Sequence, residues 1–361
     1  MFTVKKLWWH TTYGEISVKE CRYLQEGILV RPFSESAGIK CRGYSLPLQR
    51  RMTDFGSDDS FSKACEKMME HYGITIPFSA MRTITESHAA KMKDNENLET
   101  DIPDECGVGC VIGEVDGTMI PIVDTFFKTD DDGKAIDKRK TRKVRWGEAR
   151  LSMAHPKGSV SPVFGATSGS VDEAGDQLAH CAILAGMDQY SKVHCVGDGA
   201  PWIVDQVDRV FGTQASFLID FYHVCDYLAA ASKRCAPDDT SSWLKQQKER
   251  MKENNVSGVL KTLQPHIEPD SVPDENAPVR QCHRYIKNRP GQFHYKEALE
   301  ADLPIGSGEV ESAHRYVIQK RLKIAGAWWK EDNAEHMLAL RALRSNNCWD
   351  DYWSGLYKKA A

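Results

Sequence analysis

The segment Val193–Ile203 places a run of apolar residues directly before a Gly197-Asp198-Gly199 turn and the start of a helix. A buried strand followed at once by a turn and a helix is typical of α/β proteins. Ligands of open α/β sheets bind beyond the carboxyl ends of the strands, which is where Asp198 falls. Asp198 could equally cap the helix expected over Trp202–Phe211. The segment therefore predicts an α/β fold and gives one candidate site residue with a structural alternative.

A second acid lies inside Cys110–Ile122, which is predicted to be two strands joined at Asp116-Gly117. Asp-Gly between apolar runs is a strong hairpin signal, so Asp116 is either a turn residue or an acid at a strand end. Further strands are expected over 145–153 and 160–167, followed by a helix around 178–184. Another strand, Ala215–Asp220, leads into a helix that begins near Phe221. These segments alternate strands with helices, as a mixed sheet with flanking helices requires.

Two glutamates follow the turn Gly306-Ser307-Gly308 near the C-terminus. Ser307 is expected as the N-cap of a helix, and the helix dipole stabilises carboxylates in the first turns, which explains both acids without any chemistry. Helical phase separates them, because Glu311 falls on the margin of the apolar stripe while Glu309 falls between Tyr316 and Lys320. A desolvated carboxylate is costly unless it is paired or bound to a metal. Glu311 is therefore the stronger candidate ligand.

The N-terminal part predicts a small β-rich lead-in over 1–47 and two helices within 48–94. Ser60 is expected to cap the first of these helices, Gly73 to end it, and Ser79 to cap the second. Two helices joined by a short turn suit a helix-turn-helix DNA-binding unit, although any two-helix corner has the same pattern. A polar linker follows near 93–104.

Composition limits the functional classes. The chain has 361 residues and a net charge of −4, which argues against wholesale coating of nucleic acid but allows local basic surfaces. Eleven cysteines without a CxxC pair give no zinc signal and, with no leader-like N-terminal segment, indicate reduced thiols in the cytoplasm. No apolar run is long enough for a membrane span. We expect a cytoplasmic, nucleoid-associated protein with no membrane partner, although the chain could be truncated at its start.

Basic residues gather in two places. The run from Asp137 to Arg145 is either a solvated loop or a phosphate-contacting segment, and a second basic group with two tryptophans lies near the C-terminus. The tryptophans could stack on an unpaired base or pack in the core. The candidate DNA-binding residues are Lys138, Arg139, Lys140, Arg142, Lys143, Arg145, Arg315, Lys320, Arg321, Lys323, Trp328 and Trp329.

Three acids thus stand at the end of a first strand (Asp116), after a later strand (Asp198) and in a C-terminal helix (Glu311). This order suits a ribonuclease-H-like fold, in which central strands bring two aspartates side by side and a packed helix supplies a third acid. Adjacent carboxylates repel each other unless cations lie between them, and hard oxygen ligands favour Mg²⁺ or Mn²⁺. We expect two ions at the three acids, a pair that can activate a water or 3′-hydroxyl.

At these residues the sequence resembles the DDE transposases of bacterial insertion sequences, in the Mutator-like group. The resemblance runs from about Ser60 to Arg344. Its motifs are Val115-Asp116-Gly117-Thr118, Gly197-Asp198-Gly199-Ala200-Pro201-Trp202-Ile203, Asp220-Phe221-Tyr222-His223, Gly306-Ser307-Gly308-Glu309-Val310-Glu311-Ser312, Gln319-Lys320-Arg321-Leu322-Lys323 and Gly326-Ala327-Trp328-Trp329. The resemblance implies that Asp116, Asp198 and Glu311 are the metal-binding catalytic triad, with Asp220, His223 and Glu309 as accessory residues. Without it, His223 is more simply a packing or helix-start histidine.

The resemblance also implies a domain order. It consists of the lead-in (1–47), the helix-turn-helix (48–94), the first part of the catalytic core (106–235), a helical insertion (236–303) and the C-terminal core helices (304–345). Relatives of this kind often have a paired-cysteine, zinc-ribbon-like element near the N-terminus, which this sequence lacks. Metal-dependent folding of the lead-in is therefore not expected.

We expect a transposase that binds the terminal repeats of its own element, cleaves the DNA and joins the 3′-hydroxyl ends to target DNA. Synapsis of two ends implies a homodimer or a larger complex. Two alternatives remain open at this point. One is a ribonuclease-H-like nuclease without strand transfer, and the other is a non-catalytic DNA-binding protein descended from a transposase.

Overall fold

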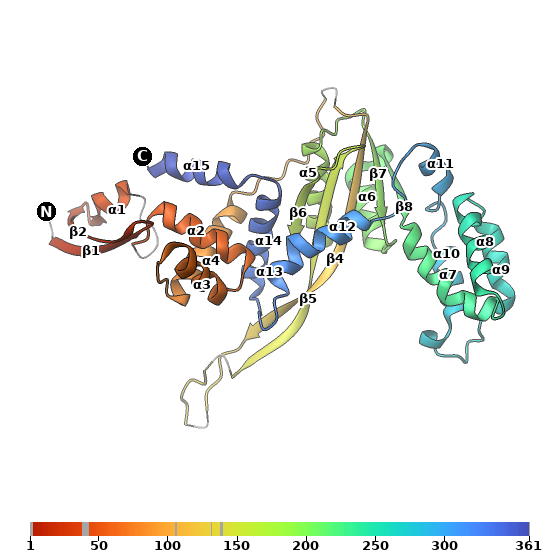
Figure 1. Cartoon of the computed structure of the whole chain (residues 1–361), viewed down its shortest axis with the longest axis horizontal. Coiled ribbons are helices and arrows are strands. Elements are labelled where there is room, and N and C mark those ends of the chain that lie inside the picture. The colour runs from red at the N-terminus through yellow and green to blue at the C-terminus, as the bar shows by residue number, and fades with distance from the viewer. Residues whose placement is uncertain (1–2, 38–42, 105–106, 131, 138–139, 361) are drawn as a thin grey trace.

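The computed structural model describes residues 3–37, 43–104, 107–130, 132–137 and 140–360 (Figure 1). Two sheets lie within these ranges. The N-terminal sheet contains β1 (Thr3–Thr11), β2 (Gly14–Gln25) and β3 (Ile28–Val30), all antiparallel. The larger sheet contains β4 (Cys110–Thr125), β5 (Arg142–Pro156), β6 (Val163–Thr167), β7 (Lys192–Gly197) and β8 (Ala215–Ile219). The molecule is thus α/β with a mixed central sheet, as the sequence predicted.

The strands of the larger sheet follow the spatial order β6-β5-β4-β7-β8. β4, β5 and β6 form an antiparallel meander, whereas β7 runs parallel to β4 and β8 parallel to β7. Parallel neighbours need a crossover connection, and α5 (Val171–Leu184) and α6 (Pro201–Phe211) supply these crossovers. The chain therefore changes from antiparallel to parallel pairing at β4, in the middle of the sheet.

The predicted turn at Asp116-Gly117 is wrong. β4 runs unbroken through both residues, with Asp116 opposite Leu151 and Gly117 opposite Arg150 on β5. The strand continues because Ile120 and Ile122 beyond it are buried, at 0% and 2% exposure. Burial of these side chains outweighs the local turn preference of Asp-Gly. The connection to β5 comes after Thr125 instead.

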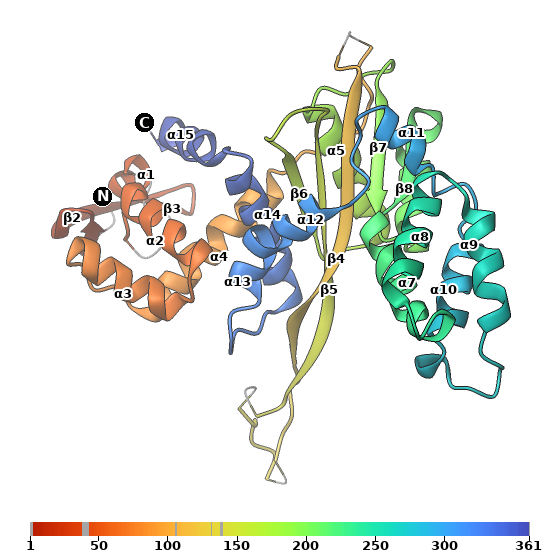
Figure 2. The ribbon, with the colours of Figure 1, turned by 45° about the vertical axis from the view of Figure 1, so that its right-hand side comes forward.

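Beyond Gly117, β4 and β5 pair with each other and with no other strand among the described residues, and they extend past the rest of the sheet as a two-stranded ribbon (Figure 2). Aromatic side chains are exposed along it, with Phe127 72% and Trp146 62% accessible. Trp329 joins the ribbon at its base, where the Val123 N–H donates to the Trp329 carbonyl at 2.7 Å. An exposed ribbon of this kind is available to a partner.

The two faces of the central sheet are covered by different helices. Val111, Val115 and Cys195 pack with α5 and α6 on one face. On the other face, Leu151 and Met153 pack with the C-terminal helices. This alternation follows from the strand period of two residues. The C-terminal helices are α12 (Gly308–Ala313), a π-helix (His314–Gln319), α13 (Lys320–Leu322), α14 (Glu331–Ser345) and α15 (Trp349–Ala360).

A separate helical body lies beside β8, at the far end of the molecule from the N-terminal sheet (Figures 1 and 2). Its apolar core, in which Leu228, Met251 and Val279 are fully buried, is continuous with Val196, Leu218 and Ile219 of β7 and β8. Its helices are α7 (Phe221–Cys235), α8 (Thr240–Lys252), α9 (Val256–Leu263), α10 (Pro278–Lys287) and α11 (Tyr295–Glu300).

The N-terminal helices are α2 (Leu46–Asp58), α3 (Phe61–Tyr72) and α4 (Phe78–Asp94), preceded by the short α1 (Pro32–Ser36). Ser60 caps α3 as expected, since its hydroxyl accepts from the Lys63 N–H, and Gly73 ends α3 with φ of 64°. Ser79 is not the cap of α4. The N-cap is Pro77, whose fixed φ of −62° suits the residue before a first turn.

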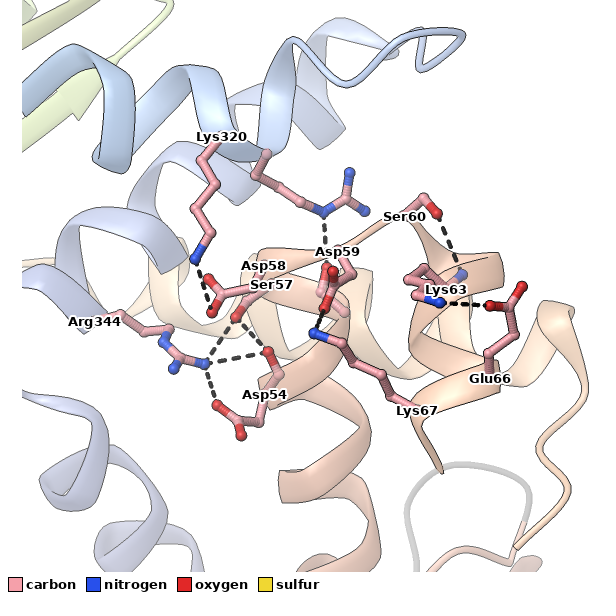
Figure 3. A network of polar contacts seen from close by, with 12 residues as sticks. Asp54, Ser57, Asp58, Asp59, Ser60, Lys63, Glu66, Lys67, Lys320 and Arg344 are labelled. Carbon is pink, nitrogen blue, oxygen red and sulfur yellow. Dashed lines mark hydrogen bonds and ion pairs between the residues drawn. The ribbon is translucent and has the colours of Figure 1, made fainter. Parts of the chain in front are cut away.

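Arginines of the C-terminal helices bind the C-terminal end of α2 (Figure 3). Arg344 donates to Asp54 and to the Ser57 hydroxyl, while Lys320 lies 3.5 Å from Asp58. Arg341, only 7% exposed at its side chain, also pairs with Asp58. Burial alone would raise the pKa of Asp58, but the charges of Arg341, Arg344 and Lys320 hold that pKa below its usual value.

Within the described part of the chain, none of the helices combines the length and the apolar character needed to cross a bilayer.

We predict that Asp58→Asn lowers the free energy of unfolding by roughly 2–3 kcal/mol, because it leaves a buried arginine without its carboxylate. The urea midpoint at neutral pH measures this loss. Glu66→Gln is the matched control, since it removes the exposed Lys63–Glu66 pair of the same region at little cost. Equal midpoints for the two variants would contradict the assigned role of Asp58.

Candidate active site

Asp116 lies within β4, and Asp198 directly follows the neighbouring strand β7. The paired register of β4 and β7 ends with Glu114 opposite Val196. Asp116 follows two residues later within β4, and Asp198 follows two residues after Val196, directly beyond the end of β7. Residues level with each other on parallel strands point to the same face of a sheet. Both aspartates are half-buried. The fold therefore brings two acids that are far apart in sequence to one edge of one sheet face.

Each aspartate accepts a hydrogen bond from a backbone N–H that follows it closely in the chain. The Gly117 N–H donates to Asp116 Oδ1 at 2.7 Å, and the Ala200 N–H donates to Asp198 Oδ1 at 2.8 Å. Asp198 is not the helix cap, because the N-cap of α6 is Ala200. Asp116 Oδ2 lies 3.4 Å from Nε2 of His314, a residue that is only 3% exposed. Asp198 and Asp116 thus each keep one carboxylate oxygen outside these backbone hydrogen bonds.

α12 lies over the same face and is attached to β4 by a third acid, Glu114. The Val310 N–H donates to Glu114 Oε2 at 2.8 Å, while Glu114 Oε1 is buried without a hydrogen-bond partner among the described residues. The pKa of Glu114 is raised to about 8, mainly by burial and also by the charges of Glu309, Asp220 and Glu311, while the Val310 hydrogen bond acts to lower it. Glu114 is therefore a largely protonated acid two residues before Asp116 on the same strand face.

Sequence reasoning missed Glu114. A signal was present, because Glu114 interrupts an apolar strand and shares the parity of Asp116, so both side chains must face the same way. An acid at such a position is buried unless the face is open to solvent. Its environment, however, depends on α12, which lies almost 200 positions further along the chain.

The two glutamates of α12 take different positions. Glu309 Oε2 lies 3.1 Å from Nε2 of the buried His155 on β5. Glu311 is exposed, not on the core margin as helical phase predicted. The phase fails because α12 has only six residues and continues as a π-helix from His314. A π-helix has wider turns than the α-helical period assumed for the prediction.

Asp220 accepts hydrogen bonds from residues at the starts of two helices, α7 and α12. Its Oδ1 accepts from the N–H groups of Tyr222 and His223 at the start of α7. Its Oδ2 accepts from the N–H and hydroxyl of Ser307, both at 2.7 Å. Ser307 therefore donates to Asp220 and makes no side-chain cap of its own on α12. The His223 ring packs against Tyr227 and Tyr285, with centroids 5.4 and 5.7 Å away.

The expected DNA-binding residues divide by exposure. Arg321 and Trp329 are buried, at 1% and 4%, so neither side chain is presented to DNA. Arg321 donates to the Gly56 carbonyl at 2.8 Å and lies over the rings of Phe61 and Trp329, and burial lowers its pKa to about 10. These two residues hold α2 and α3 against the C-terminal helices instead.

The other candidates are largely accessible. Arg142 lies 3.8 Å from the ring centre of Trp328, and Lys323 donates to the Thr118 hydroxyl. Arg145 is paired with Asp124 and Glu331. Exposed side chains belong to Lys140, Arg142, Lys143, Arg145, Arg315, Lys320, Lys323 and Trp328. Lys138 and Arg139 lie outside the described residues.

Among the residues that the structure describes, no three histidine, cysteine, aspartate or glutamate side chains are grouped as a metal site. Asp116 and Asp198 each follow the last paired residues of β4 and β7 by two positions, while Glu311 is linked to this region through α12 and its influence on Glu114. The geometry is that of two acids on one sheet face beneath an acid-bearing helix.

Comparison with known proteins gives a partial match. The model of a family described as "Uncharacterised protein family (UPF0236)" matches residues 185–351, a segment that includes Asp198, Asp220 and Glu311 but not Asp116. UPF0236 protein TTE2489 of Caldanaerobacter subterraneus subsp. tengcongensis is 24% identical over 160 residues, which is 44% of this chain and 32% of that protein.

Two further matches come from the same organism. One is 25% identical over 160 residues, 44% of this chain and 32% of its own, and its name joins eleven locus designations from TTE0033 to TTE2212. The other, TTE0402, is 24% identical over 160 residues, 44% of this chain and 30% of its own. The chain spans about a third of the length of the curated relatives it matches.

We predict that the stability of the protein in EDTA falls as the pH rises from about 4.5 to about 8, relative to Glu114→Gln. The folded-state pKa of Glu114 is raised, so the folded state holds a proton that the unfolded chain has already lost. The loss grows by up to about 1.4 kcal/mol per pH unit. Glutamine keeps an acceptor for the Val310 N–H and does not titrate. Urea unfolding of both proteins across this range measures the difference, and parallel profiles would refute the assignment.

Proposed function

We propose that this chain is a DNA transposase with a ribonuclease-H-like catalytic core. It would bind the ends of its element, cleave phosphodiester bonds and join the 3′-hydroxyl ends to target DNA. The observation that most supports this proposal is the register of β4 and β7, because Asp116 and Asp198 each follow its last pair, Glu114 and Val196, by two residues, next to the helix that contains Glu311.

The strand order supports the same proposal. Ribonuclease-H-like enzymes use two central strands to bring aspartates together and a packed helix for the third acid. Here β4 is the middle strand of five, β7 is its parallel neighbour, and α12 contacts β4 through the Val310–Glu114 hydrogen bond. β4, β7 and α12 all lie within the described residues.

The donor set fits a hard divalent cation in its chemistry, since Asp116, Asp198 and Glu311 offer only carboxylate oxygens. We propose that these three acids hold two Mg²⁺ or Mn²⁺ ions. Bound ions of this type activate a water or 3′-hydroxyl and stabilise the leaving oxygen of a phosphodiester. A cation on this face would stabilise the ionised form of Glu114, whose Oε1 is buried without a hydrogen-bond partner among the described residues.

The chain's own residues then have separate tasks. His314 lies against Asp116 Oδ2 and limits its rotation. Asp220 and Glu114 hold the first turn of α12, which sets the height of Glu309 and Glu311 above the sheet. The exposed residues Arg142, Lys143 and Arg145 line the β4–β5 ribbon, where they would contact DNA phosphates. α3 and α4 would contribute to recognition of the ends.

The relatives add a second line of support. A name shared by eleven loci of one genome describes a gene present in many copies. Repeated insertion of a mobile element produces such copies, whereas an ordinary housekeeping gene is not multiplied in this way. Joining of two ends brings two copies of the chain together, so we propose that it acts as a homodimer or a larger complex on paired ends.

We expect Asp116→Ala, Asp198→Ala and Glu311→Ala each to lower Mg²⁺-dependent cleavage of element ends about a hundredfold or more, equivalent to about 2.7 kcal/mol. The reason is that each change removes a proposed metal ligand. Glu309→Ala, one position from Val310 on the same helix, is the matched control and should retain most activity. Full cleavage by any one of the first three removes that residue from the triad, and loss confined to Glu309→Ala would reassign the third ligand.

A non-catalytic DNA-binding protein is the second candidate, because three acids are not grouped as a metal site in the described residues. Pre-cut element ends incubated with a supercoiled target and Mg²⁺ separate the candidates. We predict a joined product that disappears in EDTA. Cleavage without joining would indicate a nuclease, and binding of ends with neither reaction would indicate a DNA-binding protein.

A further inference from the structure

A polar cavity of about 300 Å³ lies on the helical body beside the Asp198 loop. Its walls come from α7 and from α10 with the two residues that follow it. The lining residues are Tyr227, Gln281, Arg284, Tyr285, Asn288 and Arg289. None of these has a carboxylate, and each has at least one hydrogen-bond donor. A cavity lined in this way suits an anion.

The arginines and tyrosines that line the cavity indicate which class of anion it binds. A guanidinium is planar and matches phosphate oxygens in pairs. Tyr227 and Tyr285 stack on each other with centroids 4.3 Å apart, and the Arg289 guanidinium lies 4.0 Å from the Tyr285 ring centre. Stacked aromatic rings beside arginine are typical of surfaces that bind single-stranded nucleic acid.

A carboxylate outside the cavity fixes the orientation of the Arg284 side chain. Asp274, which does not line the cavity, accepts from both terminal nitrogens of Arg284, at 3.2 and 2.5 Å. The pair is exposed, so Asp274 fixes the side chain without removing it from solvent. Arg284 thus lines the cavity with two of its five guanidinium N–H groups held by Asp274 and the other three outside this pair.

The same residues hold the Asp198 loop. The Tyr285 hydroxyl donates to the Asp198 carbonyl at 2.6 Å, and Arg289 Nε donates to the Gly199 carbonyl at 2.9 Å. Gly199 has φ of 75°, and a Cβ there would lie 2.8 Å from Arg289 Nε, so the contact requires glycine. Arg289 thus lines the cavity and binds the loop at once.

We propose that this cavity binds a phosphodiester of the single DNA strand that lies next to the cleaved bond, and that Arg289 couples this binding to the position of Asp198. The proposal rests on the proposed function for the identity of the strand. Arg284 contacts the phosphate, Tyr227 supplies the stacking surface, and Tyr285 with Arg289 transmits occupancy of the cavity to the loop.

The test measures binding of a short fluorescent oligothymidylate to the full chain in EDTA, by anisotropy over a range of salt. We expect Arg284→Gln to weaken binding about tenfold. The slope of log affinity against log salt should fall by about 0.7, the value for one phosphate contact on a single strand. Lys287→Gln is the matched control, because it removes one charge from the same helix outside the cavity. Equal losses in the two variants would overturn the proposal.

Hydrogen exchange tests the coupling. The oligonucleotide should slow exchange of the Ala200 N–H, which bonds to Asp198 Oδ1, in the unaltered chain and in Lys287→Gln. Tyr285→Phe, which loses only the hydroxyl, should bind the oligonucleotide but leave this exchange unprotected. Protection that is equal in Tyr285→Phe and the unaltered chain would refute the coupling.

Two further results separate the possibilities. Inorganic phosphate that binds with the same dependence on Arg284, together with no binding of the oligonucleotide, would show a free-anion site and overturn the proposal. Because these measurements need no divalent ion, they remain informative if end cleavage is never observed. If the unaltered chain cleaves element ends but Arg284→Gln binds the oligonucleotide as well as the unaltered chain does, the cavity proposal is refuted and the proposed function is not.

Discussion

The first turn of α12 depends on two buried carboxylates. A helix leaves its first N–H groups without partners, and a helix of six residues has little stability of its own. Asp220 accepts from Ser307, and Glu114 accepts from Val310, so each carboxylate satisfies a backbone group that would otherwise be buried and unpaired. The positive end of the helix dipole adds to both contacts. Because α12 continues into the π-helix with His314, the same two bonds also set His314 against Asp116.

This junction explains why the site gathers acids around a buried carboxyl. Glu114 is 1% exposed, and Glu309, Asp220 and Glu311 all raise its pKa. In the absence of a cation, holding a proton on Glu114 is the least costly way to accommodate the group. Under the proposed function, a divalent ion near Asp116 would offset the same repulsion and lower the pKa of Glu114, so metal binding would favour loss of its proton.

The sequence predicted the secondary-structure elements better than it predicted the contacts between them. The strand and loop at Asp198, the cap at Ser60 and the αL end of a helix at Gly73 depend on a few adjacent residues, and these predictions agree with the structure. The turn at Asp116-Gly117 failed because burial of Ile120 and Ile122 is decided by helices far along the chain. The position of Glu311 failed because the π-helix changes the helical period. Arg321 belongs to a basic run, but the α2–α3 contact that buries it cannot be seen in local sequence.

The C-terminal helices contact both the central sheet and the N-terminal helix α2. Val317 and Ile318 pack on the central sheet, while Arg321 and Arg341 of the same region bind Gly56 and Asp58 of α2. Since buried arginines lose more from separation than exposed ones, α2 cannot move away from the sheet without exposing or unpairing them. Under the proposed function, the helices that read the element end are thereby held at a fixed distance from Asp116. Recognition of the DNA and the place of cleavage would then be set by one rigid contact rather than by a flexible linker.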